Sequence, residues 1–254
     1  MRESGLNLPK RDLKPRISGI TVLIDNGNPL QFFKDTINGA SEFVDYVKFG
    51  WGTSIISSSL EEKIEFLRQK KIEYFFGGTL FEKFVSQGKV EQFYKYCEKH
   101  GCRYVEISNG TFDMNNKEKA LFISEFSRHF TVFSEVGNKS TEKSEDFSPA
   151  QWIEWIHEDL DAGSAKVITE ARESGTSGFC RGNGEIRFEI IEDIISSGIG
   201  LDRVIFEAPN KQIQTALITA AGANVNLANI SFADPIALET LRLGLRSDTF
   251  HLFD

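Results

Sequence analysis

Eight short apolar runs recur along this chain, and each is separated from the next by a longer polar or helix-like segment. Runs of this length, rich in β-branched and aromatic residues, are typical of buried strands in a parallel sheet. Strands that alternate with helices predict an α/β fold, and eight such units predict a single (β/α)8 TIM barrel. The runs lie at residues 19–24, 44–49, 72–76, 104–108, 131–136, 165–170, 203–207 and 224–229.

The segments between the runs carry helix signals. Ser148 precedes Pro149, and Asp234 precedes Pro235, which is the usual order of an N-cap and a first helical residue. A doubly wound open sheet is the alternative, but it normally has a phosphate-binding glycine turn after its first strand, and residues 25–29 do not form one. Helices are expected at residues 57–68, 115–130, 149–160, 188–195, 210–221 and 235–245.

The length of the chain, 254 residues, is usual for one such barrel. We therefore expect one domain over residues 1–254, with an N-terminal extension at 1–15 and a C-terminal tail at 247–254. Two polar loops, at 138–147 and 174–184, follow strands and should lie on the active-site face. The second loop contains four glycines, so we expect it to be mobile without ligand and to close over bound substrate.

The net charge of −8 argues against nucleic acid or an anionic membrane as a partner, because both require a basic face. No apolar stretch approaches the roughly 20 residues of a membrane span. The first residues show no signal peptide, so a cytoplasmic location is expected. Three cysteines without a CxxC pair, Cys97, Cys102 and Cys180, are expected to be reduced thiols.

Four of the apolar runs end in a glutamate, and this regularity predicts a shared polar site. Burying one carboxylate at a strand end costs several kcal/mol unless a cation meets it. Four carboxylates at the same end of a barrel indicate an oxygen-ligated divalent cation, most readily Mg²⁺. The alternative for any single glutamate is an ion pair with a lysine that holds a loop. The four residues are Glu106, Glu135, Glu170 and Glu207.

Other polar residues follow the same strand ends and should converge on the same mouth. Alternation within a strand places Glu106 on one face with Tyr104 and Ser108, which we expect to be the barrel lumen. Residues 77–79 are either a tight turn or a backbone approach to a phosphate or carboxylate. The remaining strand-end residues are Asp25, Lys48, Gly78, Thr79, Lys139, Arg172, Asn226 and Asn229.

The histidines and tryptophans give little further indication of function. The four histidines, which have no metal-ligand spacing, are expected to be exposed, and no nucleophile elbow, Walker loop or GxGxxG motif is present. Trp51 either packs over the mouth or belongs to its rim, whereas Trp152 and Trp155 should be core residues. The histidines are His100, His129, His157 and His251.

Several segments resemble the phosphosulfolactate synthase family, in the branch found in spore-forming bacilli. The resemblance runs from about residue 14 to residue 249, and Ala228 departs from the archaeal pattern, which has glycine there. The segments are residues 14–16 (Lys-Pro-Arg), 48–54, 77–82, 105–111, 135–139, 168–175, 206–209, 224–230 and 238–249.

The resemblance implies a (β/α)8 barrel and a lyase activity. It implies that the enzyme uses Mg²⁺ to add sulfite to phosphoenolpyruvate, giving (2R)-2-O-phospho-3-sulfolactate. In methanogens this reaction begins coenzyme M biosynthesis, and in bacilli it is expected to supply sulfolactate. A homo-oligomer is implied as well, with a trimer as one form.

Under this resemblance the strand-end residues acquire roles. Lys48, Lys139 and Arg172 would hold phosphate and sulfite, with Lys139 the first choice for the acid that protonates C2. The four glutamates would ligate the metal or orient the lysines. The phosphate would lie near Asn229 and Ser231, at the usual barrel position after the last two strands, and the turn at Gly78 and Thr79 would also contact substrate.

Two other functions stay open. A different lyase or aldolase could form a Schiff base on Lys139 or Lys48, which borohydride would trap. A related heat-stress-associated plant protein shares the motifs without a settled enzymatic role, so a non-enzymatic barrel of the same family is the second alternative.

Overall fold

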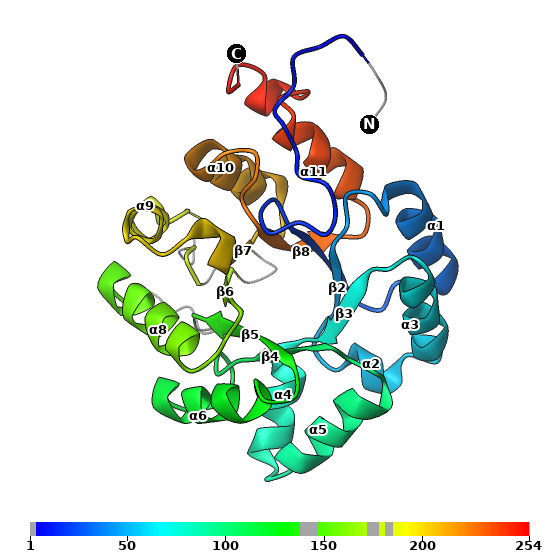
Figure 1. Cartoon of the computed structure of the whole chain (residues 1–254), viewed down its shortest axis with the longest axis vertical. Helices are drawn as coiled ribbons and strands as arrows, with labels where there is room; N and C mark the ends of the chain where they lie inside the picture. The colour runs from blue at the N-terminus through cyan, green and yellow to red at the C-terminus, as the bar shows by residue number, and fades with distance from the viewer. Residues whose placement is uncertain (1–3, 138–146, 172–177, 181–184, 254) are drawn as a thin grey trace.

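The computed structural model describes residues 4–137, 147–171, 178–180 and 185–253. Its eight strands pair in parallel in the order β3-β2-β1-β8-β7-β6-β5-β4, and the helices surround them (Figure 1). This confirms the predicted (β/α)8 barrel. β3 and β4 are in contact at the closure, but no ladder joins them among the described residues. The strands are β1 Thr21–Asp25, β2 Tyr46–Phe49, β3 Glu73–Phe76, β4 Tyr104–Ile107, β5 Thr131–Val136, β6 Lys166–Thr169, β7 Val204–Glu207 and β8 Leu227–Ser231.

The helices include four that the sequence analysis missed, α1, α2, α4 and α5. None of these four begins with a side-chain cap hydrogen bond. The helices are α1 Leu30–Ala40, α2 Thr53–Ile56, α3 Leu60–Gln69, α4 Gly78–Ser86, α5 Val90–Lys99, α6 Asn116–Phe126, α8 Pro149–Asp161, α9 Phe188–Ser196, α10 Lys211–Ala221 and α11 Pro235–Arg242, with short 3₁₀ turns η1 Leu201–Arg203 and η2 Ser247–Thr249.

Capping boxes mark where two of the predicted helices begin. Asn115 and Ser148 each form a capping box with the third helical residue, Glu118 and Gln151 respectively. Asp234 was predicted to be an N-cap, but its side chain makes no cap hydrogen bond, and Pro235 alone sets the start of α11.

The barrel has two apolar cores. One lies between the strands and the helices. The other fills the lumen with Ile20, Val22, Phe75, Phe133, Ile168, Ile205 and Ala228, against which Tyr46 and Tyr104 pack. The ring of Phe133 lies 5.2 to 5.6 Å, centroid to centroid, from those of Tyr46, Phe75 and Tyr104. These rings form an apolar floor beneath the polar strand ends.

β8 carries a bulge. Thr21 is opposite Leu227 but Leu23 is opposite Ile230, so β8 has one residue more than β1 over this stretch. Asn229 takes a left-handed conformation, with φ of 57°. The predicted strand at 224–229 overlaps β8 only at residues 227–229, and alternation does not reveal the inserted residue.

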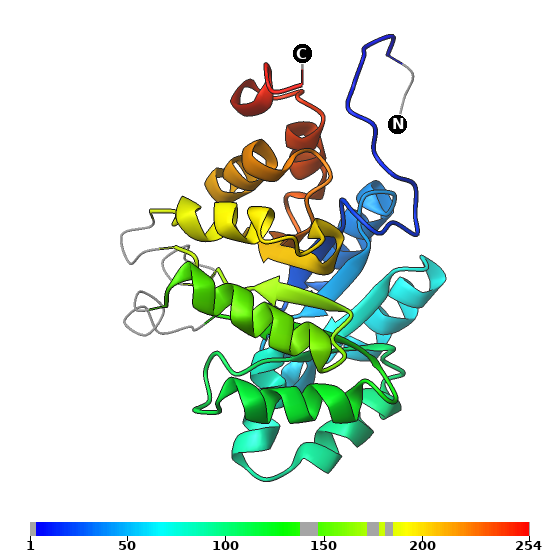
Figure 2. The ribbon, with the colours of Figure 1, turned by 60° about the vertical axis from the view of Figure 1, so that its left-hand side comes forward.

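The N-terminal segment closes the opposite end of the barrel. The guanidinium of Arg11 donates to Glu239 at 2.8 Å and to the carbonyl of Gly19 at 3.0 Å. Arg242, fully buried, donates to the carbonyls of Ala223 and Val225. Figure 2 shows the described N-terminal segment and the C-terminal turns at the same upper edge of the molecule.

His100 corrects one expectation, because it is buried against the rings of Phe76 and Tyr96. The other three histidines are exposed as expected. Trp152 is fully buried, and Trp155 is half-buried against Phe147. All three cysteines are buried free thiols. None of the described helices has the length and apolarity needed to cross a membrane.

Phe133→Ala should lower the free energy of unfolding by about 3–5 kcal/mol, because it opens a cavity among four packed rings. Guanidinium denaturation monitored by circular dichroism measures this. Phe250→Ala is the matched control: that side chain is 58% exposed, and its loss should change stability by less than about 0.5 kcal/mol. Equal denaturation midpoints for the two variants would contradict the assignment of the lumen core.

Candidate active site

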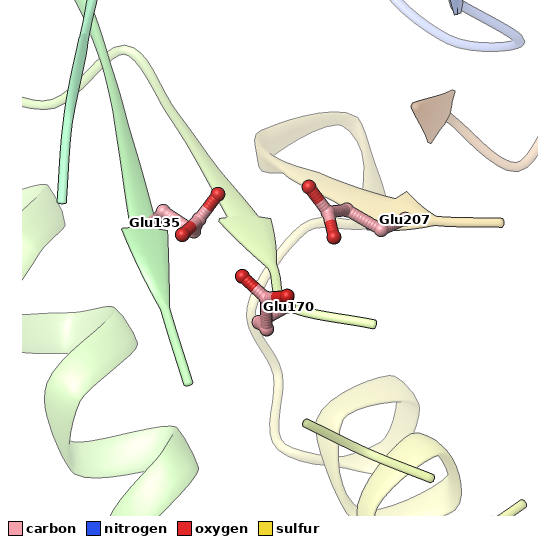
Figure 3. A group of neighbouring side chains, drawn as sticks. All are labelled: Glu135, Glu170 and Glu207. Carbon is pink, nitrogen blue, oxygen red and sulfur yellow. The ribbon is translucent and has the colours of Figure 1, made fainter. Parts of the chain in front are cut away.

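Three carboxylates meet at the mouth of the barrel, the end where the carboxyl ends of the strands converge. Glu135 is on β5, Glu170 directly follows β6, and Glu207 ends β7. One oxygen from each lies within 4.8 Å of the others, and all three side chains are buried. Figure 3 shows these carboxylates turned toward one another between the strand ends. Such a cluster is suited to hold one hard cation.

Lys48 on β2 links this cluster to the fourth glutamate. Its Nζ atom lies 3.0 Å from Glu106 Oε2, 3.2 Å from Glu207 Oε1 and 3.5 Å from Glu135 Oε2. Glu106 Oε1 accepts a hydrogen bond of 2.6 Å from the backbone N–H of Gly78. The structure thus divides the predicted set: three glutamates converge, and Glu106 faces Lys48 and the start of α4.

Lys48 and the glutamates at the mouth shift one another's pKa values. Burial lowers the pKa of Lys48, but the carboxylates of Glu106, Glu207 and Glu135 outweigh it and hold that pKa well above its ordinary value. Burial raises the pKa of Glu106 to about 7, with Lys48 opposing the increase and Glu135 adding to it. Among the described residues, three buried carboxyl groups share the ammonium group of Lys48, and Glu170 lies beside two of them. Such a cluster of carboxylates is suited to a cation.

Two adjoining cavities open at the mouth. A cavity of about 390 Å³ is lined by Ile24, Lys48, Trp51, Gly77, Gly78, Thr79, Glu106, Thr111, Glu170, Glu207 and Asn229. A smaller one of about 130 Å³ is lined by Ile24, Asn26, Asn28, Pro209, Asn229, Ser231 and Phe232. The four residues predicted to bind substrate, Gly78, Thr79, Asn229 and Ser231, all line one or both cavities. The bulge at Asn229 places its side chain between the two.

A third cavity, of about 590 Å³, lies between the loop after β4 and Trp155. It is larger, but none of the four glutamates lines it, and it shares only Thr111 with the mouth cavity. We assign the site to the mouth cavity of about 390 Å³, because Lys48 and Glu106, whose pKa values are shifted, line it.

The structure gives Gly78 a role that the sequence did not predict. Its N–H already donates to Glu106, and a Cβ at this position would overlap the hydroxyl of Ser108. Glycine is therefore required here for β4 and α4 to approach each other. This turn orients Glu106, and a backbone contact to substrate would have to come from Thr79.

Sequence reasoning left Trp51 undecided and missed Glu82. Trp51 lies at the mouth, 42% exposed, with a left-handed φ of 48°. Glu82 is buried on α4, and its carboxylate accepts hydrogen bonds from the backbone N–H groups of Thr111 at 2.7 Å and Phe112 at 2.5 Å. It thus fixes the loop that brings Thr111 to the mouth. In the sequence, a glutamate directly after Leu80 and Phe81 could have indicated a buried carboxylate.

Lys139 and Arg172 lie outside the described residues, as does most of the predicted lid at 174–184. The described part of that loop returns to the end of β6. Phe179 donates its N–H to the carbonyl of Glu170 at 3.1 Å. Gly178 has φ of 73°, and a Cβ there would overlap the same carbonyl oxygen, so glycine is required.

Solved structures with a similar fold include the YdjI aldolase from Escherichia coli K12. It matches with a TM-score of 0.57 and 13% identity, over 85% of this chain and 75% of that chain. A KGPDC structure from Streptococcus mutans matches with a TM-score of 0.53 and 10% identity, over 94% of this chain and 100% of that chain. At these identities the similarity shows the barrel fold alone.

Sequence relatives carry more information. The family described as (2R)-phospho-3-sulfolactate synthase (ComA) matches residues 9–248. The phosphosulfolactate synthase of Bacillus subtilis (strain 168) is 60% identical over 252 residues, which cover 99% of this chain and 100% of that protein. The phosphosulfolactate synthase of Methanocaldococcus jannaschii is 41% identical over 236 residues, covering 91% and 94%. This chain therefore belongs to the (2R)-phospho-3-sulfolactate synthase family of enzymes.

Proposed function

We propose that this protein is a phosphosulfolactate synthase, a lyase that uses Mg²⁺ to add sulfite to phosphoenolpyruvate. The product is (2R)-2-O-phospho-3-sulfolactate. One observation carries the proposal: in a chain of this family, Glu135, Glu170 and Glu207 converge within 4.8 Å at the barrel mouth.

The donor set at the mouth fits magnesium. Carboxylate oxygens are hard ligands of the kind that Mg²⁺ prefers, and Glu135, Glu170 and Glu207 would hold the ion. No histidine or cysteine is among the described residues that line the mouth cavity, so a soft-ligand site is not favoured there. When bound, magnesium supplies positive charge against the substrate carboxylate, where negative charge develops during the addition.

The reaction forms one bond and moves one proton. The sulfur lone pair of sulfite forms the new bond to C3 of phosphoenolpyruvate. The C2–C3 π electrons move to C2 and into the carboxylate, and a proton is then added to C2 on one face. The apolar floor under the mouth excludes water from below, which strengthens the charge interactions in the site.

Lys48 has a defined task in this scheme. Its ammonium group is held by three carboxylates at the mouth. It therefore orients Glu106, Glu135 and Glu207 and adds one fixed positive charge beside the substrate. Because these carboxylates already bind the ammonium group of Lys48, other cations are needed to bind the phosphate and the sulfite.

We propose Lys139 and Arg172 for that task. They follow Glu135 and Glu170 by four and two residues in the sequence. A guanidinium can bind a phosphate or sulfite oxyanion through two parallel hydrogen bonds. Lys139 is our choice for the acid that protonates C2. The phosphate would occupy the smaller cavity, where Asn229 and Ser231 offer polar groups.

Purified protein incubated with phosphoenolpyruvate, sulfite and MgCl₂ should consume both substrates, and ³¹P NMR should show a new phosphate ester. EDTA in excess should abolish the reaction, and added Mg²⁺ should restore it. Consumption of neither substrate would favour the non-enzymatic alternative. Borohydride trapping of a carbonyl substrate on a lysine would favour the Schiff-base alternative, because sulfite addition needs no imine.

Glu170→Gln should raise the Mg²⁺ concentration needed for half-maximal turnover by roughly tenfold or more, because a ligand charge is lost. A titration of initial rate against MgCl₂ measures this. Glu73→Gln is the matched control, since Glu73 begins β3 at the opposite end of the barrel and pairs with Arg103. Equal Mg²⁺ requirements in both variants would remove Glu170 from the metal site.

Lys139→Ala should lower kcat by about 100-fold, the usual scale for loss of a general acid, with the circular dichroism spectrum unchanged. Lys95→Ala, which removes a surface lysine paired only with Glu91 among the described residues, is the control and should keep normal turnover. Near-normal kcat in Lys139→Ala would remove Lys139 from the acid role.

A further inference from the structure

Two charged side chains are completely buried behind Glu135, on the helix side of β5. Lys119 of α6 and Asp159 of α8 lie 2.8 Å apart, Nζ to Oδ2, with neither side chain exposed. Asn116, one turn before Lys119, donates to Glu158 at 2.6 Å and so ties α6 to α8 beside the pair.

Stability alone does not account for this pair. The cost of removing two charges from water commonly matches or exceeds their attraction, and apolar residues of similar volume often replace such pairs without loss. Burial raises the pKa of Asp159 above its ordinary value, although Lys119 opposes the increase. Ile123 and Ile156 are fully buried on the same two helices, so apolar side chains pack readily at this interface.

The second contact of Lys119 points to a role. Its Nζ atom donates a hydrogen bond of 2.8 Å to the backbone carbonyl of Glu135. The ladder between β4 and β5 ends with Ile107 opposite Ser134, so this carbonyl lies one residue beyond the last pair. On its other edge β5 stays paired with β6 through Val136, so Lys119 holds the edge of β5 that has no further β4 partner.

The side chain of Glu135 points the other way, into the mouth. There its carboxylate meets Lys48 at 3.5 Å and converges with Glu170 and Glu207 (Figure 3). One residue thus has a buried ammonium group bound to its carbonyl on the outside of the barrel and its carboxylate in the site. A shift of this peptide would displace the carboxylate from the other two.

We propose that Lys119, held in place by Asp159, is a positioning residue for Glu135 and sets the affinity of the three-carboxylate cluster for a divalent cation. The inference rests on the proposed function in one respect, that Glu135, Glu170 and Glu207 hold the cation. Groups that orient metal ligands from behind typically change metal affinity by about 10- to 100-fold when removed.

The fold contains a matched control for this pair. Lys63 of α3 is equally buried, lies 2.7 Å from Asp25 Oδ2, and donates to the backbone carbonyl of Asn28 at 2.7 Å. The construction is the same, but it holds the loop after β1, which contributes no carboxylate to the cluster. Lys63→Met therefore removes an equivalent buried charge without loosening Glu135.

The experiment measures Mn²⁺ binding to the metal-free protein by electron paramagnetic resonance, with Mg²⁺ as competitor, and thermal unfolding in parallel. Lys119→Met should weaken Mn²⁺ binding by roughly tenfold or more, whereas Lys63→Met should stay within about twofold of the unsubstituted protein. Both single variants should have a lowered Tm, because each leaves a buried aspartate unpaired.

A double variant separates the effect of Lys119 on the position of Glu135 from its effect on the stability of the protein. Lys119→Met with Asp159→Leu removes both charges and should recover much of the lost Tm. Its Mn²⁺ binding should stay weak, because the carbonyl of Glu135 still lacks the lysine. If Lys119→Met does not fold, this double variant carries the same comparison with Lys63→Met.

Three results would overturn the inference. Unchanged Mn²⁺ affinity in the Lys119 variants would show that the pair does not position Glu135. Equal weakening in the Lys119 and Lys63 variants would indicate a general loss of structure. Absence of Mn²⁺ binding in the unsubstituted protein would refute the metal assignment of the proposed function itself, and the inference with it.

Discussion

The ammonium group of Lys48 is the interaction on which the mouth of this barrel depends. It lies within 3.5 Å of carboxylates from β4, β5 and β7, strands that would otherwise bring like charges together in a buried space. Removing one partner of a buried ion pair leaves a charge that neither water nor protein satisfies. Glu106 then extends the network to the N–H of Gly78, and Glu207 extends it to the N–H of Ala171.

This network lies between buried apolar side chains below and hydrogen-bonded loops above. Aromatic rings close the lumen below the carboxylates, and electrostatic interactions are stronger where water is excluded. Buried polar side chains hold the loops above: Glu82 fixes the loop after β4, and Lys63 with Asp25 fixes the loop after β1. A chain with a net charge of −8 can bind anionic substrates only where positive charge is concentrated locally. We propose that this positive charge comes from three sources: Lys48, a metal ion, and the cations Lys139 and Arg172.

The sequence predicted much of the fold. Eight apolar runs were sufficient for the barrel, because strand periodicity is local and parallel strands need intervening helices. It did not predict α1, α2, α4 and α5, none of which begins with a side-chain cap hydrogen bond. It also misplaced β8, in which a bulge at Asn229 breaks the alternation. It predicted an exposed His100, whereas the rings of Phe76 and Tyr96 bury this side chain.

For the site, the sequence by itself determined which residues could meet. Glu106, Glu135, Glu170 and Glu207 each lie at or next to the end of a strand, and parallel strands in a barrel present those ends at one mouth. Only the tertiary structure decided how they meet: three glutamates converge, while Glu106 faces Lys48 and Gly78. Lys48 and Glu207 are 159 residues apart in the chain, so their contact depends on barrel closure and strand register. No local sequence pattern encodes barrel closure or strand register, because both depend on how all eight strands and their helices pack together.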